Sequence, residues 1–217
     1  MKISLLQPEI IRGDINHNVK KIQQLINISN GELLILPEYP LTGSLVLDRK
    51  ANIHEWSEKS KIAKKDIKVP ENKVLILNTL KKENNNYYNI CELLPTDKFQ
   101  IKVFPDDTER NYGIIPGKSH EIFNLFGKKF KILICMDFKY VEKILTDNVD
   151  FFIWIYHFTK ENYLRMLSLL KNFVKKRTVP VLASSLVSDK NCGFSTFIDD
   201  KKVISLSNLE GLLEIEL

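Results

Sequence analysis

The chain has 217 residues, of which 44% are hydrophobic and 27% are charged, and its formal net charge is +5. This composition supports one hydrophobic core and carries no mark of intrinsic disorder. No apolar run approaches the roughly 20 residues of a membrane span, and the apolar stretch at 3–6 is too short for the core of a secretory leader. We therefore predict a single domain over residues 1–217, with no membrane partner.

The basic residues and the cysteines exclude further classes of protein. Lysines are spread along the chain and not concentrated in one segment, which favours a solvated surface and no nucleic-acid partner. Cys91, Cys135 and Cys192 are an odd number without metal-ligand spacing, which indicates a reducing compartment and no metal site. The predicted location is the cytoplasm.

The first half of the chain alternates apolar strands with helical segments. Apolar residues at three-and-four spacing over 15–26 predict a helix with one buried face, and Asp14 and Asn16 are both candidate caps. The triplet Asn84-Asn85-Asn86 predicts a turn that joins two strands into a hairpin. In this half we expect strands at 3–6, 32–36, 73–80 and 87–94, and a partly helical segment at 53–67.

The second half continues the strands and adds two helices. We expect helices at about 140–146 and 162–176. The expected strands are 99–104, 121–126, 131–135, 151–156, 180–184, 193–198, 202–207 and 212–217. Many strands with few helices predict an α/β fold, a four-layer α-β-β-α sandwich of two packed sheets with helices outside.

Three chemically different side chains stand where apolar runs stop. Glu38 follows the run 33–36, Lys102 lies near the end of 99–104, and Cys135 closes 131–134. A buried strand that ends at a polar residue delivers that side chain to the rim of a sheet, where functional groups of α/β folds converge. An acid, a cation and a thiol at such positions predict a catalytic set.

The chemistry of this set is that of covalent hydrolysis. A thiol is mostly protonated at neutral pH, so Cys135 needs a base, and Glu38 is the predicted one. Lys102 and the backbone N–H of Met136 would stabilise an oxyanion. Each residue also has a structural interpretation: Cys135 as a small buried hydrophobe, Glu38 as a loop acid or cap, and Lys102 as one surface lysine among many.

Ordered motifs along nearly the whole chain resemble the carbon-nitrogen hydrolase (nitrilase) superfamily. Gln7 closes the first strand, and Gly13-Asp14 with Asn18-Val19 is similar to the family's helix entry. The remaining motifs are Leu34-Ile35-Leu36-Pro37-Glu38 with Leu41-Thr42-Gly43, Lys102 before Phe104-Pro105, Glu109 before Pro116-Gly117, Ile134-Cys135-Met136-Asp137 with Glu142, and Gly193-Phe194-Ser195 with Ile198-Asp199.

The chain also departs from the family's pattern. Lys139 stands where the family usually has Arg, and Met136 stands where Tyr is common. The lysine block lacks the customary His, and Asn172-Phe173-Val174-Lys175 replaces an Arg-Ala-x-Glu pattern. These differences bear on substrate class and subunit packing more than on the chemistry.

The resemblance implies an enzyme that hydrolyses a small linear carboxamide or an N-carbamoyl compound without metal or cofactor. A nitrile substrate is confined to a minority of the family. Glu109 would orient the base or the substrate, and the pocket would include Tyr39, Tyr156 and His157. For His157 a surface cap and a Cys/His dyad are the alternatives.

The resemblance further implies a homodimer or a higher homo-oligomer, whose interface involves Val141, Ile144 and the 162–176 helix. Cys91 and Cys192 are expected to be structural.

Two functions of other classes remain open at this stage. The departures from the motifs are compatible with a catalytically silent binding or scaffold protein of the same fold. The basic charge is compatible with a nucleic-acid-associated protein, whose affinity would fall steeply with salt.

Overall fold

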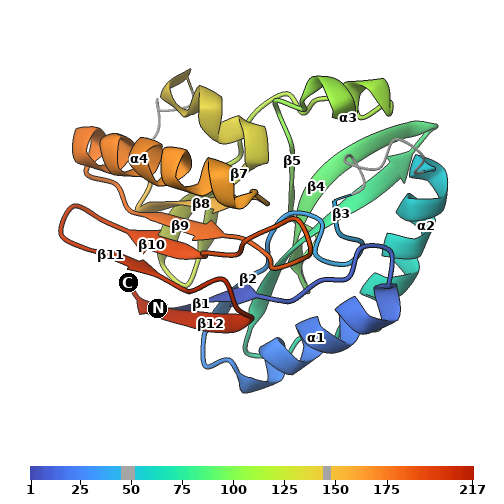
Figure 1. Ribbon diagram of the computed structural model, residues 1–217, viewed down its shortest axis with the longest axis horizontal. Coiled ribbons are helices and arrows are strands. Elements are labelled where there is room, and N and C mark those ends of the chain that lie inside the picture. Colours follow the sequence, from blue (N-terminus) through green and yellow to red (C-terminus); the bar gives the residue numbers. More distant parts are fainter. Residues whose placement is uncertain (45–51, 144–147) are drawn as a thin grey trace.

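Two packed β-sheets form the centre of the molecule (Figure 1). The computed structural model describes residues 1–44, 52–143 and 148–217, and within these ranges each sheet has six strands. The first sheet has the order β12 (Gly211–Glu216), β1 (Lys2–Gln7), β2 (Leu33–Ile35), β3 (Val74–Glu83), β4 (Asn86–Leu94), β5 (Phe99–Ile101). The second has the order β11 (Val203–Ser205), β10 (Thr196–Ile198), β9 (Val181–Ser184), β8 (Phe151–Ile155), β7 (Lys128–Ile134), β6 (Phe123–Leu125).

Helices cover the outer face of each sheet. The first sheet packs against α1 (Ile15–Ile28) and α2 (Ile53–Lys64) through one apolar cluster. The second packs against the 3₁₀ helix η1 (Cys135–Lys143) and α4 (Lys160–Arg177) through another. The layers are therefore helix, sheet, sheet and helix, which confirms the predicted fold class (Figure 1).

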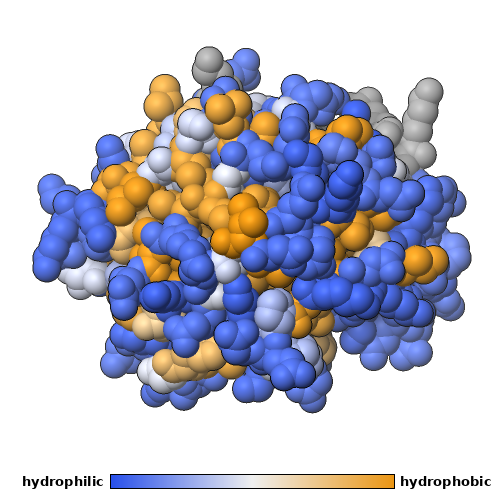
Figure 2. Space-filling view, turned by 90° about the horizontal axis from the view of Figure 1, so that it is seen from below, coloured by the Kyte–Doolittle hydropathy of each residue, from blue (hydrophilic) through white to orange (hydrophobic). Residues whose placement is uncertain are grey.

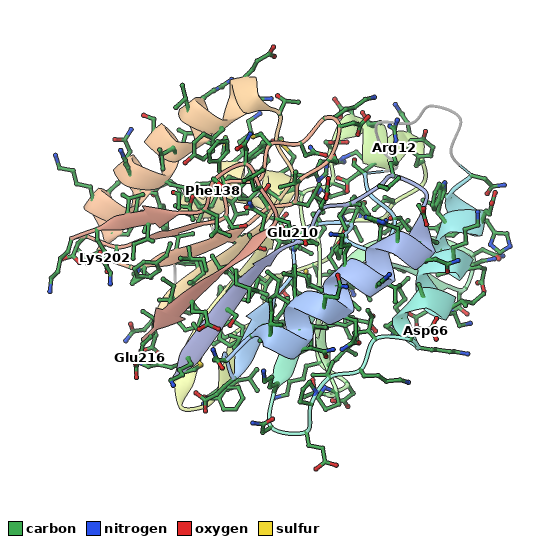
Figure 3. All side chains as sticks on the ribbon, turned by 60° about the horizontal axis from the view of Figure 1, so that its bottom comes forward. Arg12, Asp66, Phe138, Lys202, Glu210 and Glu216 are labelled. Carbon is green, nitrogen blue, oxygen red and sulfur yellow. The ribbon has the colours of Figure 1, made fainter. Side chains whose placement is uncertain are left out.

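Strand alternation separates the core between the sheets from the core beneath the helices. In β8, Ile153 and Ile155 face the opposite sheet, whereas Trp154 faces the helical layer, as does Tyr156 directly after the strand. Phe138 of η1 lies beside α4 in Figure 3 and stacks on Trp154 with ring centroids 4.4 Å apart. The position of a residue in the strand alternation therefore decides whether its side chain enters the core between the sheets or the core beneath the helices.

The first and last strands are neighbours. β1 pairs with β12 in antiparallel register from Lys2 opposite Glu216 to Gln7 opposite Gly211. Just before β12, Glu210 lies beside α1 (Figure 3), where Lys21 Nζ is 3.1 Å from its Oε1.

The outer surface on this side is mostly hydrophilic. Figure 2 shows apolar side chains gathered on part of this face, among many hydrophilic ones. None of the helices in the described ranges is long and apolar enough to cross a membrane.

The secondary structure agrees with the sequence pattern except around two helices. Asp14 caps α1, and the Asn84–Asn86 turn joins β3 and β4 as predicted. The helix predicted from residue 140 instead begins at Cys135, and residues 144–147 of that prediction lie outside the described ranges. The short helix α3 (Asp107–Asn111) was not predicted, although Asp106 and Glu109 form a capping box at its start.

Candidate active site

The three side chains predicted at strand ends meet at the rim of the core between the two sheets. Glu38 follows β2, Lys102 follows β5, and Cys135 follows β7. Lys102 Nζ lies 2.9 Å from Glu38 Oε1, and the Cys135 thiol is close enough to the Glu38 carboxylate for the two groups to interact. Because the Glu38 and Lys102 side chains are 0% and 1% exposed, bulk water does not screen their interaction.

Glu109 completes the cluster from α3. Its Oε2 lies 2.7 Å from Lys102 Nζ, so the ammonium sits between two carboxylates. The capping box fixes this acid, because the Asp106 N–H donates to Glu109 Oε2 at 2.9 Å and the Glu109 N–H donates to Asp106 Oδ1 at 2.8 Å. The Tyr39 hydroxyl donates to Glu109 Oε1 at 3.1 Å.

Asn89 of β4 links the two carboxylates and was not singled out from the sequence. Its Nδ2 lies 2.9 Å from Glu38 Oε1, from Glu109 Oε1 and from the Tyr39 hydroxyl. Asn78 of β3 donates to Asn89 Oδ1 at 2.6 Å, which fixes the orientation of that amide. The available signal was an Asn directly before the apolar residues Ile90 and Cys91 of β4, which by itself indicates only a polar contact.

Sharp turns follow the strands that supply the acid and the thiol. Cys135 has φ 48° and Tyr39, directly after Glu38, has φ 52°, both in the left-handed region. Such a conformation costs a non-glycine residue about 1–3 kcal/mol and persists where surrounding contacts hold it. The Trp154 indole donates to the Cys135 carbonyl at 2.9 Å, and the Tyr39 N–H donates to Asn78 Oδ1 at 2.8 Å.

Asp137 holds the cysteine turn against the lysine segment. Its Oδ1 accepts the N–H groups of Val103 at 3.1 Å and Phe104 at 2.7 Å, and its Oδ2 accepts the Ile134 N–H at 3.0 Å. His120 Nε2 lies 3.1 Å from Oδ2. One buried carboxylate therefore connects the backbone beside Lys102 to the backbone beside Cys135, and the sequence motif gave it no role.

The charges of the cluster support one another. Burial disfavours the charged form of Lys102, but the charges of Glu38, Cys135 and Glu109 outweigh it and raise the pKa of Lys102 well above its usual range. Burial also disfavours ionised Glu38, yet Lys102 and His157 hold its pKa below the usual range. Glu38 is thus a carboxylate and Lys102 an ammonium at neutral pH.

The pKa values of the Cys135 thiol and of Glu109 are both raised. Burial, together with the charges of Glu38 and Glu109, raises the pKa of the Cys135 thiol well above its usual range, against the opposing effect of Lys102. Burial is also the main reason that the pKa of Glu109 is raised, with Lys102 opposing and Glu38 adding to the effect. The resting thiol is therefore protonated and requires a base for attack.

The three predicted pocket residues lie in different environments. Tyr39 belongs to the cluster through its hydroxyl, and His157 Nδ1 lies 2.8 Å from Glu38 Oε2. Tyr156 instead stacks on Trp154 in the core beneath α4, with its hydroxyl donating to the Phe194 carbonyl at 3.2 Å. Neighbouring residues at a strand end point to opposite faces, so Tyr156 and His157 enter different compartments.

Of the other two cysteines, Cys91 borders the cluster, because its Sγ accepts a hydrogen bond from Asn78 Nδ2 at 3.7 Å. Cys91 is fully buried in the core between the sheets, and Cys192 Sγ lies 3.4 Å from the Phe158 carbonyl. Met136 follows Cys135 in the first turn of η1, where N–H groups have no partner within the helix. In the described ranges, no group of three or more His, Cys, Asp and Glu side chains is placed to hold a metal ion.

The fold that carries this site is that of the carbon-nitrogen hydrolase (nitrilase) superfamily. Solved structures with this fold match the chain over nearly its full length, at sequence identities of 14–19%. The sequence itself matches no protein-family model and no curated protein.

Three of the solved structures illustrate the match. The glutamine-dependent NAD⁺ synthetase from Acinetobacter baumannii has a TM-score of 0.83 and 19% identity over 98% of this chain, which spans only 44% of the synthetase. A CN-hydrolase superfamily protein from Xanthomonas campestris with an arsenic adduct in its active site has a TM-score of 0.77, 14% identity and coverage of 99% and 89%. A mutant amidase from Nesterenkonia sp. AN1, with acrylamide added at its active-site cysteine, has a TM-score of 0.78, 15% identity and coverage of 100% and 93%.

Proposed function

We propose that this protein is a hydrolase of a non-peptide carbon–nitrogen bond, with Cys135 as nucleophile, Glu38 as general base and Lys102 as oxyanion stabiliser. The observation that carries the proposal is the meeting of these three side chains, with Glu109, in one buried cluster from four separate segments. A purely structural cluster would gain little from placing a protonated thiol against a carboxylate and an ammonium.

In the first half of the reaction, the thiol proton passes to Glu38 as Cys135 Sγ bonds to the substrate's carbonyl carbon. The oxyanion that forms lies against Lys102 and the N–H of Met136, and one such donor is worth about 2.7–4 kcal/mol of barrier. Glu38 then returns the proton to the departing nitrogen. Ammonia or an amine leaves, and the acyl group remains on Cys135 as a thioester.

In the second half, Glu38 takes a proton from a water molecule that attacks the thioester carbon. The same oxyanion site stabilises the second tetrahedral intermediate, and the proton returns to Cys135 Sγ as a carboxylic acid is released. Glu109 keeps Lys102 in place during both halves, because its Oε2 contacts the ammonium at 2.7 Å.

The substrate that we propose is a small linear carboxamide or an N-carbamoyl compound. The resemblance of the sequence motifs supports this class, and so do the structural matches to amidases. A silent scaffold or binding protein of the same fold is the alternative, and the departures from the motifs at Met136 and Lys139 favour it.

Ammonia release from a panel of ω-amides, N-carbamoyl amino acids and nitriles tests the proposal. We expect turnover with the amide or carbamoyl compounds, and loss of turnover in Cys135→Ala with an unchanged circular dichroism spectrum. Cys91→Ala is the matched control, because it removes a thiol that lies in the core between the sheets.

Thiol labelling separates the enzyme from the scaffold. An enzyme would show stoichiometric labelling of Cys135 that a substrate amide slows, whereas a scaffold would show slow labelling without protection. Ammonia release that persists in Cys135→Ala would exclude the mechanism.

We also propose that the protein is a homodimer that uses the face formed by η1 and α4. Support comes from two large apolar side chains that α4 exposes, Leu164 and Leu169. Ile144, also expected there, lies outside the described residues. Sedimentation velocity of the wild type should give a dimer mass, and Leu169→Glu should give a monomer.

A further inference from the structure

The second carboxylate oxygen of the proposed base contacts a histidine. Glu38 Oε1 accepts hydrogen bonds from Lys102 Nζ and Asn89 Nδ2, each at 2.9 Å. Glu38 Oε2 lies 2.8 Å from His157 Nδ1. Since Oε1 already has two donors, Oε2 is the oxygen with capacity left for the thiol proton, and His157 lies directly against it.

His157 is placed there by the strand that precedes it. It continues the alternation of Ile153 and Ile155 in β8, so it enters the space between the sheets at the rim. Cys192 fixes the next residue, because its N–H donates to the Phe158 carbonyl at 3.1 Å. The His157 side chain is 13% exposed, which leaves it in contact with both solvent and the buried carboxylate.

The charged and titratable groups around His157 come from several elements. Glu38 after β2 touches the imidazole, and the Tyr39 ring lies 6.1 Å from it between centroids. Beyond Glu38 stand Lys102 after β5, Glu109 of α3 and Cys135 of η1. Of these groups, Glu38 is the one at ion-pair distance from His157.

We propose that His157 is a positioning residue for the general base: its imidazole holds Glu38 Oε2 in place, so that the carboxylate can accept the thiol proton of Cys135. This role rests on the proposed function of Glu38. His157 itself takes no proton from Cys135.

The alkylation rate of Cys135 tests the inference without requiring a substrate. Iodoacetamide labelling at pH 8 is followed by peptide mass spectrometry in wild type, His157→Asn and His157→Ala. Asn can supply an amide N–H to Oε2, and Ala supplies none. His54→Gln is the control, because His54 is exposed in the first turn of α2.

We expect equal rates in the wild type and in His54→Gln. His157→Asn should keep a rate close to that of the wild type, because the amide restores a donor to Oε2. His157→Ala should be about tenfold slower, the loss expected when a charged group loses one polar partner. Circular dichroism of each variant verifies that it is folded.

Two results would overturn the inference. One is a His157→Asn rate as low as that of His157→Ala, and the other is a His157→Ala rate equal to the wild-type rate. The proposed function fails separately, if no compound of the panel releases ammonia in the wild type. A Cys135 alkylation rate that depends on His157 in an inactive protein would keep the positioning role and discard the hydrolase.

Discussion

Replacing Asp137 should separate the lysine segment from the cysteine turn and destabilise the protein. In Asp137→Ala the buried Ile134 N–H and the partly buried N–H groups of Val103 and Phe104 all lose their acceptor. An N–H that loses a charged acceptor costs about 1–3 kcal/mol, least where water replaces it, so the sum is about 3–5 kcal/mol. In a chain of this length, that lowers Tm by about 6 °C or more.

The assay is urea unfolding followed by circular dichroism, with Cys135 alkylation as a second measurement. Asp199→Ala is the matched control, because Asp199 Oδ1 also accepts two backbone N–H groups, those of Lys201 and Lys202, but in an exposed turn. We expect the control to lie within about 1 kcal/mol of wild type. Asp137→Ala should alkylate more slowly, because Glu38 and Lys102 no longer face the thiol.

The reasoning fails if Asp137→Ala unfolds at the same urea concentration as Asp199→Ala. It also fails in part if stability falls as expected and the alkylation rate of Cys135 does not change. In that case Asp137 would stabilise the fold without arranging the site.

Two further predictions concern the charges of the cluster. Lys102→Met leaves the carboxylates of Glu38 and Glu109 buried without a cation and should cost about 3–5 kcal/mol in urea unfolding at pH 7. The double variant Lys102→Met/Glu38→Gln should recover part of that loss. A Lys102→Met variant as stable as wild type would show that these ion pairs do not stabilise the fold. Because folding raises the pKa of Glu109, its contribution to stability is present at low pH and is lost as pH rises through the folded-state value. The stability of wild type relative to Glu109→Gln should therefore fall as pH rises above the ordinary range of a glutamate, and a constant difference would show that Glu109 does not titrate as described.

The sequence predicted those parts of the site that depend on where strands end. Apolar runs placed Glu38, Lys102 and Cys135 at strand ends, and the structure brings these three side chains together. Period-two alternation could also have separated Tyr156 from His157, since neighbouring residues of a strand face opposite sides. The capping pair Asp106 and Glu109 could likewise have indicated α3.

Other parts depend on contacts that local patterns do not encode. Asn89 reaches Glu38 across 51 residues of sequence, and its position beside apolar residues of β4 indicates burial without naming a partner. The helix η1 begins at Cys135, five residues earlier than predicted. The left-handed backbone conformation of Cys135 ends β7 at Ile134 and lets the helix begin at once. Strain held by tertiary contacts overrides the local preference of a non-glycine residue.

The pairing of β1 with β12 bears on how the chain folds as it is synthesised. Ser4 and Glu214 bond side chain to side chain although 210 residues separate them. While the polypeptide leaves the ribosome, one side of β1 lacks its neighbour until β12 has emerged. Contacts of such sequence separation slow folding, and an unpaired strand edge invites association with other chains. Shortening the protein by its last seven residues should therefore yield aggregates and not a smaller stable domain.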